Sequence, residues 1–168
     1  MLWELRDAGP VVLVPAAWLA VGAAELGYLG ETGIYIAHLV MAGFITFFAV
    51  TGWDEMADGA LRAWRLVLVA GLVLTLAGIA GFLVRDGSDP LLATSLVGWI
   101  ILPALGLVYT GLELPDARLV YLGGAGCSLV GAALFLATLG GVDEAVVPIA
   151  FLLVGLGQTT GIVDASLR

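Results

Sequence analysis

The sequence predicts an all-α membrane protein, a six-transmembrane-helix bundle with parallel internal two-helix repeats. Apolar residues make up 61% of the 168 residues and charged residues only 12%, with a mean hydropathy of +1.11. A soluble domain carries roughly a quarter charged residues. Four uncharged runs are each long enough, at about 18 residues or more, to cross ~30 Å of hydrocarbon as a helix. They are residues 66–84, 91–112, 119–142 and 145–163.

A repeated stretch is the third observation behind this prediction. Residues 65–83 recur as residues 118–136, which lie 53 positions later, and nine of the nineteen aligned positions are identical. A period of two helices returns each copy to the same orientation in the membrane. The sequence therefore predicts repeats related by an axis along the membrane normal.

The first two helices are expected at residues 11–28 and 33–53, separated by a turn at Gly30, Glu31 and Thr32. The first of them has the apolar core of a secretory signal peptide. However, Glu4 and Asp7 accompany Arg6 in the leading segment, whereas a signal peptide begins with a basic segment. We therefore expect residues 11–28 to be retained as a helix.

Four further helices are expected at residues 66–84, 91–112, 119–139 and 145–163, joined by short charged or glycine-containing turns. The helix 91–112 contains Pro103, which leaves one backbone carbonyl without its intrahelical donor. A neighbouring helix or water can supply that donor, so we expect a kink and not a break. With no long linker, residues 1–168 form a single domain.

The arginines predict the orientation of the bundle. When the helix ends are assigned alternately to the two sides, five arginines fall on one side and only Arg85 on the other. The five are Arg6, Arg62, Arg65, Arg118 and Arg168. Arginine and lysine are enriched in cytoplasmic loops, so both termini are expected in the cytoplasm and the chain in the cell membrane.

The repeated positions carry small residues at helical spacing. The first copy has Gly71, Thr75 and Gly78, and the second has Gly124, Ser128 and Gly131. Small residues on one helix face let helix backbones approach closely within a membrane. We interpret both sets as helix-packing positions; the alternative is that they line a pore or substrate path.

A candidate polar cluster surrounds the first predicted turn. Glu25 and His38 lie at equal distances from its centre, with Tyr28 and Tyr35 one helical turn from them. A histidine beside a carboxylate can pass protons or respond to pH between about 5 and 8, and an ionisable residue within a span indicates function. The alternative is an interfacial pair with tyrosines in the headgroup region.

A second candidate set lies in the inner halves of the second and sixth helices. It consists of Thr46, Gln158, Thr159 and Thr160. An amide and hydroxyls in a bundle can coordinate a small solute or cation. The competing interpretation is interhelical hydrogen bonding.

Several functions are disfavoured by the composition. The formal charge of −8 argues against nucleic-acid binding, which requires a basic surface. One His and one Cys cannot form a bis-His haem site or a multi-ligand zinc site, and no cofactor is expected. No catalytic motif is found, and neither Ser95 nor Ser128 has a histidine on a plausibly adjacent turn. We therefore expect no enzymatic activity.

Fourteen acidic residues and no lysine are typical of a halophilic proteome.

Two functional classes remain. The first is movement of a small solute or protons through the bundle. The second is a non-catalytic scaffold or accessory subunit, or a protein that binds lipid or another apolar ligand. The expected partners are the lipid bilayer and either a second copy or a larger membrane complex. A hydrated cavity running from His38 toward Gln158 would favour transport, whereas a packed interior with an open glycine-rich face would favour a scaffold.

Overall fold

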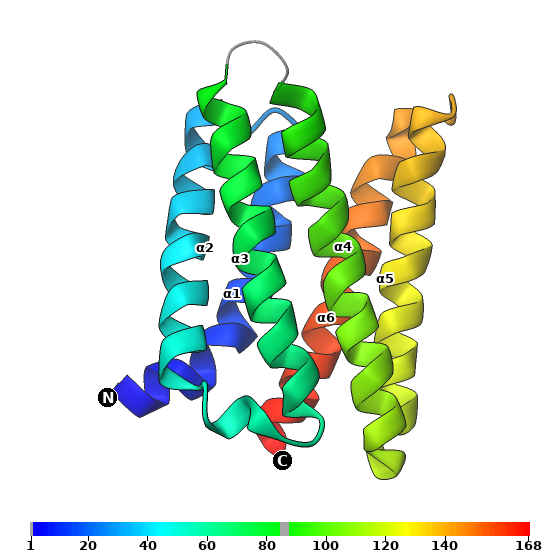
Figure 1. Ribbon diagram of the computed structural model, residues 1–168. Coiled ribbons are helices and arrows are strands. Elements are labelled where there is room, and N and C mark those ends of the chain that lie inside the picture. Colours follow the sequence, from blue (N-terminus) through cyan, green and yellow to red (C-terminus); the bar gives the residue numbers. More distant parts are fainter. Residues whose placement is uncertain (1, 85–87) are drawn as a thin grey trace.

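A computed structural model describes residues 2–84 and 88–168 of the chain (Figure 1). Six α-helices run through these residues, and the described part contains no strand. They are α1 Leu2–Glu25, α2 Glu31–Thr51, α3 Leu61–Leu83, α4 Ser88–Glu113, α5 Arg118–Leu139 and α6 Val147–Leu167. Each predicted span thus coincides with a helix, and the predicted all-helical bundle is confirmed.

The helix α1 ends three residues before its predicted limit. Gly27 has a φ of +77°, a left-handed conformation that glycine adopts without steric cost. The N–H of Tyr28 then bonds the carbonyl of Ala23 over 2.8 Å and closes the helix end. Tyr28 therefore lies in the turn and does not continue the helix face of Glu25.

The other helix ends also differ slightly from the sequence prediction. Three short 3₁₀ helices, Glu55–Ala57, Pro115–Ala117 and Glu144–Val146, occupy the connections before α3, α5 and α6. The helix α4 runs through Pro103 without interruption. The helix α6 extends to Leu167, four residues beyond the predicted 163, so that Asp164 and Arg168 lie one turn apart at its end.

The helices form a ring in which each packs against its neighbours in sequence and α1 closes against α6 (Figure 1). The most extensive contacts join α5 to α6 and α3 to α4, and those between α1 and α2 are much smaller. Both chain termini lie at the same end of the bundle, which we call the terminal end. Arg62, Arg118 and Arg168 occupy helix ends there, because α3 and α5 begin and α6 ends at that side.

Most of the buried core lies among α3 to α6, and Trp18 of α1 packs into it. Its central residues include Ile100 and Leu107 of α4, Tyr121 of α5 and Val154 of α6, which are all at most 1% exposed. Of the residues in the most apolar stretch of α6, 39% are buried, whereas only 6% are buried in the corresponding stretch of α2. The helix α2 is therefore the most peripheral of the helices α2 to α6.

Five helices of the described chain, α2 to α6, are long and apolar enough to cross a membrane. The apolar part of α1, Gly9–Glu25, is shorter. Apolar side chains such as Leu119, at 88% exposed, cover the outer surface of the bundle. These long apolar helices and this apolar surface are compatible with a membrane-embedded protein, because soluble proteins rarely expose large continuous apolar patches.

Candidate functional site

Gln158 forms the polar centre of the bundle. Its side chain is 4% exposed and accepts a hydrogen bond over 2.9 Å from the indole Nε1 of Trp18 in α1. Its amide nitrogen donates to the carbonyls of Trp99 and Ile100 in α4, over 3.1 and 3.5 Å. Gln158 therefore joins three helices, α1, α4 and α6, and both ends of its amide are engaged.

The Trp99 carbonyl is the group that Pro103 leaves without an intrahelical donor. In a regular helix the N–H of residue 103 would bond the carbonyl of residue 99, and proline has no N–H. Gln158 supplies the missing donor from α6. The sequence-based expectation that a neighbouring helix can satisfy this carbonyl is confirmed.

Three tryptophans join the helices in the same way: each indole N–H bonds a polar side chain on a neighbouring helix. Trp99 donates to Thr75 over 3.0 Å, and Trp64 donates to Thr110 over 3.0 Å. Trp18 completes the set through Gln158. Each indole therefore has its polar atom satisfied inside an apolar contact, as buried tryptophans require.

A glycine precedes each of these acceptors; Gly71 and Gly155 leave room for the tryptophan, whereas a Cβ on Gly106 would lie at ordinary contact distance, 3.8 Å, from Trp64. A Cβ on Gly71 would lie 2.6 Å from the ring of Trp99, and a Cβ on Gly155 would lie 3.1 Å from Trp18. The pair in α3 and α4 also shares local sequence, Gly-Leu-Val-Leu-Thr at 71–75 and Gly-Leu-Val-Tyr-Thr at 106–110. Sequence reasoning did not identify this short repeat, although each copy follows a tryptophan, Trp64 or Trp99, and this pattern could have revealed it.

The two sets of predicted packing residues face different surroundings. In α3, Gly71 and Thr75 receive the indole of Trp99. In α5, a Cβ added to Gly124 would lie 2.5 Å from the carbonyl oxygen of Gly157. A Cβ added to Gly131 would lie 2.5 Å from the carbonyl oxygen of Ala150. The first set therefore holds a side chain, whereas the second brings the α5 and α6 backbones together.

Both hydroxyls within these sets bond their own helix. Thr75 donates to the carbonyl of Gly71 over 2.9 Å, and Ser128 donates to that of Gly124 over 3.1 Å. They are 1% and 0% exposed, respectively. With their hydrogens used inside the helix, these positions serve close packing and present no free donor to a solute.

His38 is half-buried where α2, α3 and α4 meet. Its Nδ1 is 2.9 Å from the carbonyl of Ile34 in its own helix, and its Nε2 is 3.5 Å from the hydroxyl of Ser95 in α4. The ring packs edge-on against Phe82 with centroids 5.4 Å apart. A Cβ on Gly78 would lie 2.5 Å from the imidazole, so the glycine makes room for it.

The carbonyl partner fixes the proton arrangement of His38. A carbonyl oxygen only accepts hydrogen bonds, so Nδ1 carries the hydrogen in this contact. In the neutral ring Nε2 is then the acceptor and Ser95 the donor. The expectation that no histidine lies beside Ser95 is wrong, because helix packing brings His38 to it from 57 positions away. Ser95 is only 2% exposed.

The predicted cluster around His38 is brought together only in part. Tyr35 and His38 both pack against Phe82, which lies 6.1 Å from the tyrosine ring. Glu25 is exposed, and Tyr28 is 84% exposed in the turn that follows α1. Among the described residues no hydrogen bond or ion pair joins Glu25 to His38.

The threonines predicted with Gln158 form no hydrogen bond between helices among the described contacts. Thr46 and Thr160 are exposed and donate to the carbonyls of Ala42 and Leu156 in their own helices, over 2.8 and 2.7 Å. The hydroxyl of Thr159 is buried without a hydrogen-bond partner. Of the four predicted residues, only Gln158 forms interhelical hydrogen bonds among the described contacts.

Charged groups gather at the terminal end. The guanidinium of Arg168 contacts the carboxylate of Asp164 at 2.5 and 3.2 Å, and this hydrogen-bonded carboxylate raises the pKa of Arg168. The guanidinium of Arg65 stacks on the indole of Trp53, 3.6 Å from the ring centre. Such contacts fix long basic side chains at one surface of the bundle.

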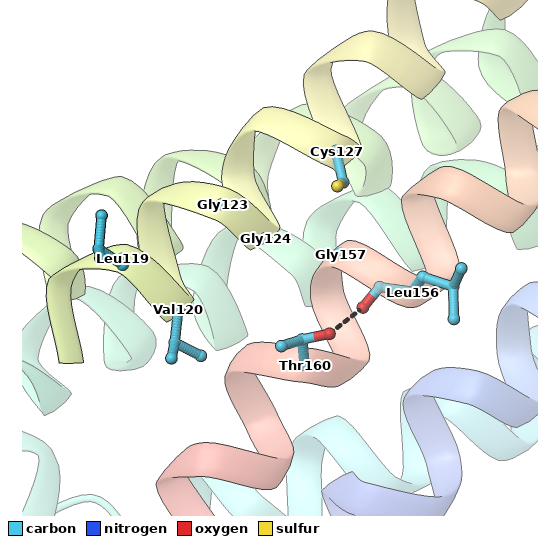
Figure 2. Close-up of a pocket in the computed structure, with 8 residues that line it drawn as sticks. All are labelled: Leu119, Val120, Gly123, Gly124, Cys127, Leu156, Gly157 and Thr160. Atoms are coloured by element: carbon cyan, nitrogen blue, oxygen red, sulfur yellow. Dashed lines mark hydrogen bonds between the residues drawn. The ribbon is translucent and has the colours of Figure 1, made fainter.

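Two open pockets lie on the surface of the described chain. The first, of about 250 Å³, is a groove between α5 and α6 (Figure 2). We call it the α5–α6 groove; its lining residues are Leu119, Val120, Gly123, Gly124, Cys127, Leu156, Gly157 and Thr160. The second, of about 290 Å³, lies near Glu25, Glu31 and Phe82 at the end opposite the termini. Neither pocket is lined by His38 or Gln158.

Comparison of the chain with protein-family models, curated proteins and solved structures finds no match.

Proposed function

We propose that this chain is an integral membrane protein that acts as a non-catalytic scaffold or accessory subunit, in which the helices pack tightly and do not conduct solutes. The observation that carries the proposal is the engagement of Gln158. A transport path through the bundle centre needs free polar groups to replace the hydration of its solute. The Gln158 amide is instead used by Trp18 and by the α4 carbonyls.

The interior around Gln158 supports the same proposal. Trp99 packs over Gly71, where an added methyl group would meet its ring, and Trp18 packs over Gly155, where an added methyl group would lie 3.1 Å from its Cβ. Both pockets are open to the surface and lie away from this centre. Among the buried polar side chains, Gln158, Thr75 and Thr110 thus take part in hydrogen bonds between helices, as polar groups do in membrane bundles.

The surface at which such a subunit would act is the α5–α6 groove. Its floor is formed by Gly123, Gly124 and Gly157, and Cys127 is exposed beside it (Figure 2). The one polar side chain of its lining, Thr160, already bonds the carbonyl of Leu156. The groove is uncharged, offers no free hydroxyl and lies within the apolar spans. We propose a transmembrane helix as its occupant, since small residues let helices approach closely.

The orientation and setting are part of the proposal. The arginines at the terminal end support cytoplasmic termini under the positive-inside rule, and the acidic, lysine-free composition supports the cell membrane of a halophilic organism as the setting. The partner is either a second copy or another membrane protein.

Reconstitution tests the non-conducting part of this proposal. The full chain would be placed in sealed liposomes that contain a pH-sensitive dye, and a pH gradient or a salt gradient would be imposed. We expect the gradients to decay as in protein-free liposomes. Protein-dependent decay that is abolished by Glu25→Gln or Gln158→Leu would overturn the proposal in favour of transport.

A further inference from the structure

We draw no further inference here: the strongest candidate, the surface pocket of about 290 Å³ that Glu25 and Glu31 line beside Phe82 at the end of the bundle opposite the termini, carries nothing, because both carboxylates are exposed and the one buried hydroxyl without a hydrogen-bond partner among the described residues, that of Thr159, does not line it.

Discussion

The side-chain amide of Gln158 donates a hydrogen bond to the backbone carbonyl of Trp99 over 3.1 Å. This carbonyl lies four residues before Pro103 and has lost its intrahelical donor to the proline ring. The helix α4 continues through Pro103 because α6 supplies the missing hydrogen bond. The same amide accepts a hydrogen bond from Trp18. One side chain therefore supplies the donor that α4 lacks and also joins α1 to α6.

Replacement of Gln158 by leucine should destabilise the bundle by about 1–3 kcal/mol. The change leaves the Trp18 indole N–H and the Trp99 carbonyl without partners inside the core, and unsatisfied buried groups carry a cost of this size. Unfolding in mixed micelles of increasing denaturing detergent, followed by tryptophan fluorescence, measures the difference. Thr46→Ala is the control, because its exposed hydroxyl bonds only its own helix, and it should change little.

A substitution at Pro103 separates the two roles of Gln158, namely its hydrogen bond to the Trp99 carbonyl and its hydrogen bond from Trp18. Pro103→Ala restores an N–H that is able to bond the Trp99 carbonyl within α4. In that background Gln158→Leu should cost less than in the original chain, and the difference is the coupling energy of a double-mutant cycle. Equal costs in both backgrounds would show that the Gln158 hydrogen bond does not compensate for Pro103.

Alanine at Gly124 should be strongly unfavourable, whereas alanine at Gly123 should be tolerated. The added Cβ at Gly124 would lie 2.5 Å from the backbone oxygen of Gly157, and nothing lies within 4 Å of one at Gly123. Overpacking of this kind costs about 1–3 kcal/mol, while an unobstructed Gly→Ala change in a helix is favourable by up to about 1 kcal/mol. The detergent-unfolding midpoints of these adjacent variants should therefore move in opposite directions.

Because Thr75 accepts a hydrogen bond from Trp99, Thr75→Val should destabilise the bundle more than Thr75→Ser does. Thr75→Val keeps the side-chain shape but leaves the indole N–H without its acceptor. Thr75→Ser keeps the hydroxyl and loses one methyl group. In membrane proteins an interhelical hydrogen bond contributes about 0.6 kcal/mol, and an unpaired buried donor costs more. Thermal unfolding in detergent should rank the original chain first and Thr75→Val last.

A bulky residue in the α5–α6 groove should block association with a partner helix. Gly123→Leu fills the groove without meeting any atom within 4 Å of its Cβ. Native mass spectrometry of the protein released from its own membrane should show a retained membrane-protein partner, whether a second copy or another chain, and its loss in Gly123→Leu.

Gly43 provides the matched substitution for this experiment. It lies on the exposed face of α2, also has nothing within 4 Å of a built Cβ, and is remote in sequence from the groove. Gly43→Leu should retain the partner. Two outcomes of the mass spectrometry would count against a helix-binding role for the groove. The original chain would carry only lipid, or the two leucine variants would retain the partner equally.

The positions of the six helices followed from local properties of the chain. Uncharged runs such as 66–84 and 119–139 are long and apolar, and these features depend on neighbouring residues only. The ends were harder to place: α1 stops at Glu25 because Gly27 adopts a left-handed conformation, and the sequence offered several glycines nearby. The small residues Gly71 and Gly124 were also identified from their spacing, although not what each would contact.

The polar contacts were decided by the tertiary structure alone. One residue of shift turns a side chain by about 100° around its helix, and hydrogen bonds act only over about 3 Å. Spacing along the chain therefore cannot tell which polar side chains meet across helices. Gln158 reaches a carbonyl 59 positions away and His38 meets Ser95 across 57, whereas Glu25, its predicted partner, remains exposed. The sequence by itself determined an apolar helical bundle with close-packing positions; the rotation and depth of each helix determined which polar groups became partners.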